Sequence, residues 1–249
     1  MHLTILRFDE LGSTNTEALE HARRGADEGL CVVARRQTAG RGRLGRRWVS
    51  ERDAGLFFSL LLRPRVVELR FLPLVTLMCA AAVHDALEEL YRLDCDIKWV
   101  NDIHVGDRKI CGILAETTDT PTGLAVVAGI GVNLNSTDFP PAIAATATSI
   151  EEETGGPPDG EALLEKLILR LSEFYNLLKD VDGPRKIREE WTRRSSYAFG
   201  KRVRVVLENE TIHGITCGIE ENGALRVRLA SGGERVVHAG DVERLREDK

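Results

Sequence analysis

Arginine and glycine alternate in one short stretch, residues 35–48, which we call the arginine loop. Its sequence, RRQTAGRGRLGRRW, holds six arginines and three glycines. Glycine lets the backbone approach a ligand closely and adopt a positive φ. Arginine supplies a permanent charge and a planar fork of donors that matches carboxylate and phosphate. The pattern predicts a mobile loop that closes over a small anion, with a solvated basic loop as the alternative.

A second group of polar residues surrounds a predicted hairpin. Asn101 and Asp102 end the run KWVND, and Lys109 follows Asp102 by seven residues. Because residues 106–108 (GDR) are typical of a turn, Lys109 should return to the level of Asn101 and Asp102. A lysine, an amide and a carboxylate would then meet at one end of a sheet. Ordinary surface charges on a hairpin are the alternative.

Two further motifs could contribute to a site. Ser13-Thr14-Asn15 begins a predicted helix, where hydroxyls and free N–H groups can bind a polar or anionic group. Helix capping by Ser13 or Thr14, with Glu17 in the reciprocal position, is the simpler interpretation. Gly129 and Gly131 punctuate an apolar strand and remove side chains where something must approach the backbone.

The elements that position these motifs predict an α+β fold with a mixed sheet. We expect strands at 3–8, 31–35, 56–62, 103–105, 109–116 and 124–130, with another short strand beginning at 96. Helices are expected at 13–24, 69–90, 161–178 and 184–191, and the third of these should pack on the sheet. Four short strands at 203–207, 212–219, 224–229 and 235–238 predict a small β-barrel that leans on the main domain. The predicted domains are 1–195 and 196–249.

Composition narrows the class of protein. The chain has 249 residues, 43% of them hydrophobic, and a net charge of −5, so a general nucleic-acid footprint is not expected. No signal peptide or membrane span is apparent. Five cysteines scattered without a CxxC pair are typical of reduced thiols, and the six histidines form no metal-ligand pattern. We expect a cytoplasmic protein without structural zinc.

Together the motifs resemble those of the biotin protein ligases, also called biotin–acetyl-CoA-carboxylase ligases. The matching residues are Ser13-Thr14-Asn15, Gly40 to Arg43 with Gly45, Arg46 and Trp48, Lys98-Trp99 with Asn101-Asp102, Arg108-Lys109 with Gly112-Ile113-Leu114 and Glu116, and Gly129 to Asn133. They occur in the family's order over about residues 8–135, and 196–246 is similar to its SH3-like C-terminal domain. The resemblance implies a catalytic fold like that of class II aminoacyl-tRNA synthetases.

The resemblance also implies a reaction and its reactants. Biotin's carboxylate attacks the α-phosphate of ATP carrying Mg²⁺, giving biotinyl-5′-AMP and pyrophosphate. A lysine of a biotin carboxyl carrier domain then takes the biotinyl group and releases AMP. The closest alternatives are a lipoate–protein ligase, which shares the adenylation logic, and a non-catalytic sensor of biotin or nucleotide.

The resemblance assigns site residues by position. The implied catalytic residues are Lys109, Arg43 and Asp102. The implied biotin contacts are Ser13, Thr14, Asn15, Gln37, Gly40, Arg41, Gly42, Arg43, Lys109 and Gly112, with the strand through Ala128 and Gly129 as an apolar wall. The implied adenylate contacts are Arg41, Arg43, Arg46, Trp48, Asn101, Lys109, Gly131 and Asn133. No metal ligand from the protein is assigned.

Several roles stay open at this point. Asp102 is favoured at the reacting centre as a base for the incoming amine, but holding Mg²⁺ or orienting Lys109 are alternatives. Trp48 should cover the pocket, with a core tryptophan as the alternative. Arg35, Arg36 and Arg47 are interpreted as solvated.

Departures from the family pattern leave other points open. Val100 replaces a usual proline, and Thr38 and Leu44 replace residues that are polar in some members. The chain begins at the first catalytic strand, so we expect no DNA-binding role, and both a monomer and a homodimer are open.

Overall fold

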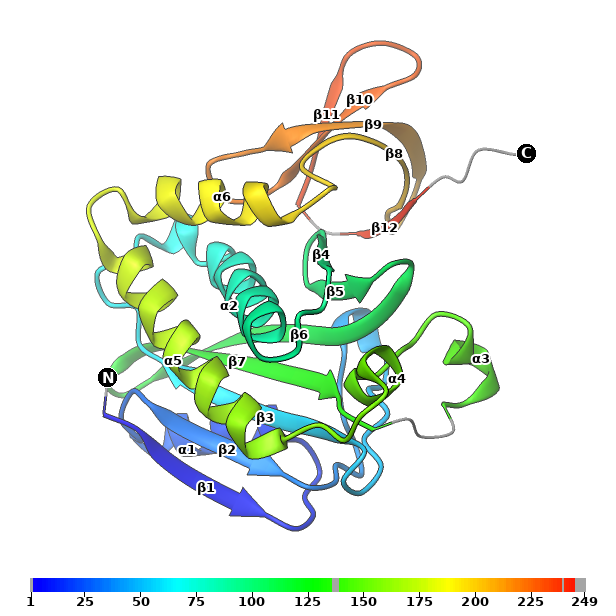
Figure 1. The fold of residues 1–249 in the computed structure, drawn as a ribbon. Coiled ribbons are helices and arrows are strands. Elements are labelled where there is room, and N and C mark those ends of the chain that lie inside the picture. The colour runs from blue at the N-terminus through cyan, green and yellow to red at the C-terminus, as the bar shows by residue number, and fades with distance from the viewer. Residues whose placement is uncertain (1, 136–138, 239, 245–249) are drawn as a thin grey trace.

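A seven-stranded mixed sheet forms the centre of the molecule (Figure 1). The computed structural model describes residues 2–135, 139–238 and 240–244. The strands, in sheet order, are β1 (Thr4–Phe8), β2 (Leu30–Ala34), β3 (Gly55–Leu62), β7 (Gly123–Asn133), β6 (Arg108–Thr120), β5 (Asp102–Val105) and β4 (Cys95–Lys98). Only the β1–β2 pair is parallel among these neighbours. The predicted mixed sheet and α+β class are confirmed.

Strand β3 is buried on both faces, which explains its nearly continuous apolar sequence GLFFSLLL. Successive side chains point to opposite faces of a sheet. Accordingly, Phe58 and Leu60 belong to the core beneath α2 (Leu74–Tyr91), whereas Leu61 packs with Ala18 and Leu19 of α1 (Thr14–Arg23). Helices therefore cover both faces of the sheet at this strand.

Helix α2 is shorter than predicted. Residues 69–71 form a separate turn, η2 (Leu69–Phe71), and Pro73 stands at the N-cap of α2. Proline has no N–H to donate to a preceding turn, so it starts this helix and does not continue an earlier one. The end of the predicted helix 69–90 is thus close to that of α2, but its predicted start is wrong.

Helices α5 (Gly160–Lys179) and α6 (Gly183–Arg194) lie outside α2 (Figure 1). The predicted apolar stripe of α5 is buried, including Leu167 and Leu171. It packs mainly on α2 and α6 and touches the sheet only slightly at β3, so the prediction that it packs on the sheet is wrong. Helix α2 is apolar nearly all round and already covers this face.

Two short helices follow β7 and were not predicted. They are α3 (Pro141–Ala144) and α4 (Ile150–Thr154), which begins at Ser149, whose Oγ accepts a hydrogen bond from the Glu152 N–H at 3.2 Å. Helices of one turn leave little periodic signal in a sequence. No helix within the described ranges is long and apolar enough to cross a membrane.

A five-stranded antiparallel sheet forms the C-terminal module. Its order is β11 (Glu234–Val237), β10 (Leu225–Leu229), β9 (Thr211–Ile219), β8 (Phe199–Val206) and β12 (Asp241–Arg244). The four predicted strands are confirmed, and β12 was missed. The module leans on the main domain, as predicted: Val203 and Leu225 share the core of α2, and Trp99 Nε1 donates to Gly223 O at 2.9 Å. The domain boundary at 195/196 stays a prediction.

Candidate active site

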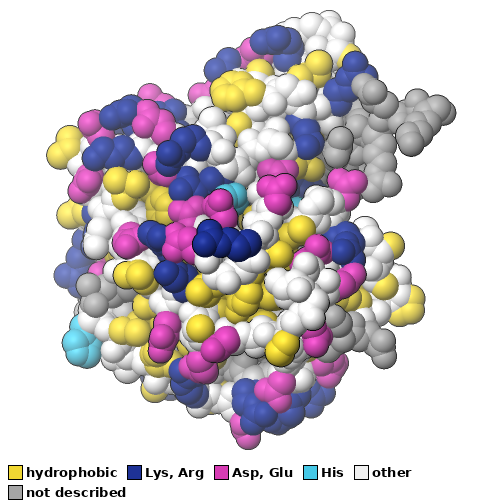
Figure 2. Space-filling model, viewed as in Figure 1, with side chains coloured by type: hydrophobic (Ala, Val, Ile, Leu, Met, Phe, Trp, Pro, Cys, Tyr) yellow, Lys and Arg dark blue, Asp and Glu magenta, His cyan; other side chains and the backbone are white. Residues whose placement is uncertain are grey.

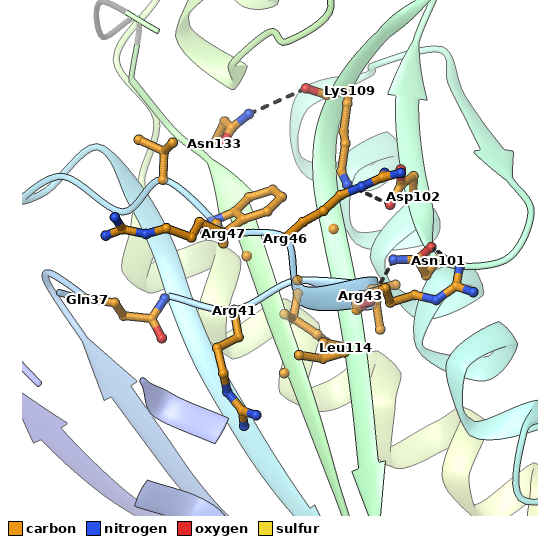
Figure 3. Close-up of a pocket in the computed structure, with 18 of the residues that line it drawn as sticks. Gln37, Arg41, Arg43, Arg46, Arg47, Asn101, Asp102, Lys109, Leu114 and Asn133 are labelled. Carbon is orange, nitrogen blue, oxygen red and sulfur yellow. Dashed lines mark hydrogen bonds and ion pairs between the residues drawn. The ribbon is translucent and has the colours of Figure 1, made fainter. Parts of the chain in front are cut away.

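A cavity of about 350 Å³ opens at the end of the sheet where the arginine loop crosses β6 and β7 (Figure 3). Every site residue assigned from the sequence lines it except Gly40: Ser13, Thr14, Asn15, Gln37, Arg41, Gly42, Arg43, Arg46, Trp48, Asn101, Asp102, Lys109, Gly112, Gly131 and Asn133. A Cβ on Gly40 would lie 2.6 Å from Trp48 O, so this glycine serves close backbone packing. Of the expected apolar wall, Gly129 lines the cavity and Ala128 does not.

Lys109 and Asp102 meet inside the cavity, as predicted, although the hairpin does not return Lys109 to the level of Asp102. Lys109 Nζ lies 2.7 Å from Asp102 Oδ1, as an ion pair without the alignment of a good hydrogen bond. The ladder pairs Lys109 with His104 and Asp102 with Gly112, with an irregularity between Ile103 and His104. The lysine side chain therefore reaches back along the sheet to the carboxylate. A cation and an anion are held together at the centre of the site.

The backbone of Lys109 is fixed by a segment that the sequence did not reveal. Lys109 N–H donates to Thr146 O at 2.7 Å, and Thr148 N–H donates to Lys109 O at 3.0 Å. Asn133 Nδ2 donates to Thr148 O at 2.8 Å and to Lys109 O at 3.4 Å (Figure 3). The segment 146–148 thus takes the place of β7 beside β6 after β7 has ended. Asn133 positions Lys109, and its predicted contact with the adenylate stays a prediction.

Arg43 reaches from the arginine loop to the turn before β5. Its Nη1 donates to Asn101 Oδ1 at 3.0 Å, and Asn101 Nδ2 donates to Ile113 O at 2.9 Å. Burial lowers the pKa of Arg43 from its usual value, with Asp102 opposing the shift and Arg46 adding to it. An arginine pKa starts far above neutrality, so Arg43 brings a partly desolvated positive charge beside Lys109.

Arg41 does not converge on Lys109 in this structure. Its guanidinium forms two hydrogen bonds to Glu116, of 2.9 and 2.6 Å, and points away from Lys109 (Figure 3). Arg41 still lines the cavity, and its implied contacts with biotin and the adenylate stay predictions. The side chain of Arg46 extends to the same side of the pocket as Lys109.

The arginines interpreted as solvated divide into two groups. Arg35 pairs with Asp53 at 2.6 Å and Arg36 with Glu10 at 2.8 Å, both outside the cavity. Arg47 borders the cavity and its Nη2 donates to Thr38 O at 3.1 Å, but its side chain is exposed, in agreement with the solvated interpretation. Leu44 is 67% exposed, and neither it nor Thr38 nor Val100 lines the cavity, so these departures do not alter its walls.

The predicted capping box at the start of α1 is absent. Ser13 occupies the N-cap, but its side chain makes no capping hydrogen bond, and Glu17 instead pairs with His21. Gln37 Oε1 accepts the Thr14 N–H at 2.8 Å, so a residue of the arginine loop satisfies this helix end. The Ser13 hydroxyl is left facing the cavity.

Three glycines make room for side chains of the protein. A Cβ on Gly112 would lie 2.6 Å from Trp48 Cζ3, and one on Gly131 would lie 2.7 Å from Trp48 Cε2. A Cβ on Gly129 would lie 2.0 Å from Asn15 Oδ1. The expected close approach is therefore real, but here the approaching groups are an indole and an amide.

Trp48 lines the cavity, with its indole packed against Gly112 and Gly131, and its role as a cover of the pocket stays a prediction. Lys109 Nζ lies 5.2 Å from its ring centroid, within cation–π range. Trp48 Nε1 is buried and has no hydrogen-bond partner in the part of the chain that the structure describes.

Part of the cavity lining was not predicted from the sequence. Phe139 and Ile143, with Thr146 and Ala147, line the cavity beside Lys109. They follow β7 in a stretch without helical or alternating periodicity, and a lone aromatic residue was the only signal there.

His104 offers a test of the electrostatics near the site. Burial, with Lys98 close by, lowers the pKa of His104 to about 4, although Asp102 opposes the shift. The unfolded chain binds this proton near pH 6.5, so stability should fall as pH drops from 6.5 towards 4. We expect a loss of about 2 kcal/mol between pH 7.5 and 5.

Urea unfolding at these two pH values checks the prediction. His104→Gln should remove most of the loss, whereas His213→Gln, at an exposed position on β9, should retain it. An undiminished loss in His104→Gln would contradict the assignment.

The fold and site define a ligase that joins a carboxylate to ATP before transfer. The model of the biotin/lipoate A/B protein ligase family matches residues 8–133, and that of the biotin protein ligase C-terminal domain matches 198–245. The chain belongs to the biotin protein ligase family.

Individual relatives agree with this membership. The chain is 36% identical over 241 residues to the biotin–[acetyl-CoA-carboxylase] ligase of Paracoccus denitrificans, covering 92% of this chain and 96% of that one. It is 34% identical over 244 residues to the bifunctional ligase/repressor BirA of Bacillus subtilis, covering 96% and 73%. The biotin protein ligase of Aquifex aeolicus in complex with biotin and ATP has a TM-score of 0.84 at 29% identity, covering 97% and 99%.

Proposed function

We propose that this enzyme attaches biotin to a lysine of a biotin carboxyl carrier domain through biotinyl-5′-AMP. The observation that carries the proposal is the pair Lys109–Asp102, which faces the arginine loop across one cavity. Its support in the comparisons is the ligase activity and the bound biotin and ATP of the relatives.

In the first step the carboxylate of biotin attacks the α-phosphorus of ATP, and pyrophosphate leaves. Two anions must approach each other, so fixed positive charge has to offset their repulsion. Lys109, Arg43 and Arg46 line the cavity and supply that charge.

Mg²⁺ would enter the site bound to the phosphates of ATP and would neutralise part of their charge. Asp102 is the one carboxylate among the residues that line the described cavity, and it already pairs with Lys109. A protein cage for the metal is therefore not part of the proposal.

In the second step a carrier lysine attacks the acyl carbon of biotinyl-5′-AMP. An amide bond forms, the bond from acyl carbon to phosphate oxygen breaks, and AMP leaves. The attacking amine must lose a proton, because a protonated amine is not a nucleophile. We propose that Asp102, the carboxylate paired with Lys109, accepts it.

The arginine loop serves as a lid over the hydrolysis-prone intermediate. Arg43→Gly should raise the rate of biotinyl-5′-AMP release into solution by about tenfold, because a half-buried charge held on Asn101 is lost. Release can be followed by filtering the enzyme after a single turnover without carrier. Arg36→Gly, in the same loop but paired with Glu10 outside the cavity, is the control. An unchanged release rate in Arg43→Gly would rule out shielding by this residue.

Incubation with MgATP, biotin and a carrier domain, read by mass, tests the function itself. A gain of one biotinyl group on the carrier is expected. A lipoyl gain from lipoate, without a biotinyl gain from biotin, would identify a lipoate ligase. Binding of biotin without transfer would identify a sensor.

The proposed partners are biotin, ATP and the carrier domain, without nucleic acid. The net charge is −5, and the face in Figure 2 intersperses basic with acidic side chains. All five cysteines are free thiols, which supports a reducing compartment such as the cytoplasm. A homodimer stays a proposal that light scattering after gel filtration would test.

A further inference from the structure

Ser59 is a polar residue in the middle of the otherwise apolar strand β3. It is fully buried, and its neighbours in the ladders are Val32 on β2 and Gly129 on β7. A hydroxyl at such a position must find hydrogen-bond partners, because burying one without them is costly. Ser59 finds both of its partners at the start of α1.

The hydroxyl oxygen of Ser59 contacts two residues assigned to the biotin end of the pocket. Ser59 Oγ lies 2.6 Å from Asn15 Oδ1 and 2.8 Å from Thr14 Oγ1. Because Asn15 Oδ1 has no hydrogen, Ser59 must donate its single proton there. Thr14 then has Ser59 Oγ at 2.8 Å and Gln37 Oε1 at 3.2 Å as acceptors for its own proton. One buried hydroxyl therefore connects both side chains.

The amide of Asn15 is held in one orientation by three strands. Its Nδ2 donates to Leu114 O at 3.0 Å and to Glu116 Oε2 at 2.8 Å, which uses both hydrogens. Its Oδ1 receives Ser59 and rests against Gly129, where a Cβ would clash. A flipped amide would turn its hydrogens towards the donor Ser59 and its oxygen towards two acceptors. Of the two polar atoms of the Asn15 side chain, only Oδ1 can therefore make a further hydrogen bond, as an acceptor.

We propose that Ser59 is a positioning residue that sets the affinity for the ureido ring of biotin. The inference rests on the proposed function. A cyclic urea presents N–H donors, which need acceptors fixed at the right places. Ser59 fixes Asn15 Oδ1 and Thr14 Oγ1 from behind, outside the cavity lining. Removal of the Ser59 hydroxyl would leave Asn15 Oδ1 without its buried hydrogen-bond donor and would allow the Thr14 side chain to rotate.

The position of Ser59 predicts which kinetic constant changes. Ser59 contacts neither Lys109 nor Arg43, which lie at the other end of the cavity. Ser59→Ala should therefore raise the KM for biotin about tenfold, because the loss of roughly one hydrogen bond weakens binding by about that factor. The kcat of adenylate formation and the KM for ATP should stay within twofold. Desthiobiotin, which keeps the ureido ring but lacks the sulfur ring, should lose affinity by the same factor.

The experiment needs controls for a structural effect. Thr216→Val removes another buried hydroxyl, which accepts the Lys201 N–H at 3.0 Å in the small sheet, and should leave the KM for biotin unchanged. Ser59→Cys keeps a weak donor of similar shape and should give an intermediate KM, and it serves as the test variant if Ser59→Ala does not fold.

Two results would overturn the inference: an unchanged KM for biotin in a folded Ser59 variant, or equal losses for biotin and ATP. Transfer of biotin by the unmodified enzyme is measured separately. Absence of transfer would contradict the proposed function. Calorimetry of biotin binding would still show whether the Ser59 variants change the affinity for biotin.

Discussion

Lys109→Gln should lower biotin-dependent exchange between ATP and pyrophosphate by about 10²–10³-fold, the usual cost of removing one preorganised stabiliser of transition-state charge. In the proposed first step this lysine, 2.7 Å from Asp102 and above the Trp48 ring, lies where the two anions meet. Glutamine retains a donor but has no charge to offset the repulsion. The fall should appear mainly in kcat, because charge repulsion is greatest as the new bond forms.

A matched lysine separates this effect from general loss of charge. Lys166 pairs with Glu89 at 3.2 Å between α5 and α2, away from the cavity, so Lys166→Gln should retain normal exchange. Lys109 is also tied by backbone hydrogen bonds to Thr146 and Thr148, which any side chain preserves. A Lys109→Gln variant that exchanges pyrophosphate within threefold of the unmodified enzyme would show that the lysine is not at the reacting centre.

The pair Lys109–Asp102 was predictable because its two residues are close in sequence. The turn at residues 106–108 joins the short strand β5 to β6, which brings Lys109 level with His104, close enough for its side chain to reach Asp102. The lining of the cavity was largely foreseen because glycines and arginines mark the arginine loop directly.

Contacts between distant segments were not predictable. Thr148, from a stretch with no periodic pattern, holds the backbone of Lys109, and Gln37 of the arginine loop accepts the first helical N–H, that of Thr14. Ser59 looked like one residue of an apolar strand, although a lone hydroxyl in such a strand is itself a signal that a polar partner lies opposite.

Asp102→Asn should separate the two steps of the reaction. We expect adenylate formation to stay within about threefold, because the amide keeps the shape of the side chain while Lys109 keeps its full positive charge for the anions. Transfer to the carrier lysine should slow by about 10²–10³-fold, the range expected when a positioned base is lost. Pyrophosphate exchange measures the first step. Mixing preformed enzyme-bound biotinyl-5′-AMP with carrier measures the second.

The pH dependence of transfer in Asp102→Asn tests whether Asp102 acts as a base. A free lysine amine has a pKa near 10.4, so raising the pH from 7 to 9 increases its neutral fraction and should partly restore transfer when Asp102 is absent. The unmodified enzyme should gain less, since the carboxylate already accepts the proton. Asp107→Asn, at the exposed hairpin turn, should behave as the unmodified enzyme. Equal slowing of both steps without recovery at high pH would instead mean that the carboxylate, 2.7 Å from Lys109 Nζ, acts only by orienting that lysine.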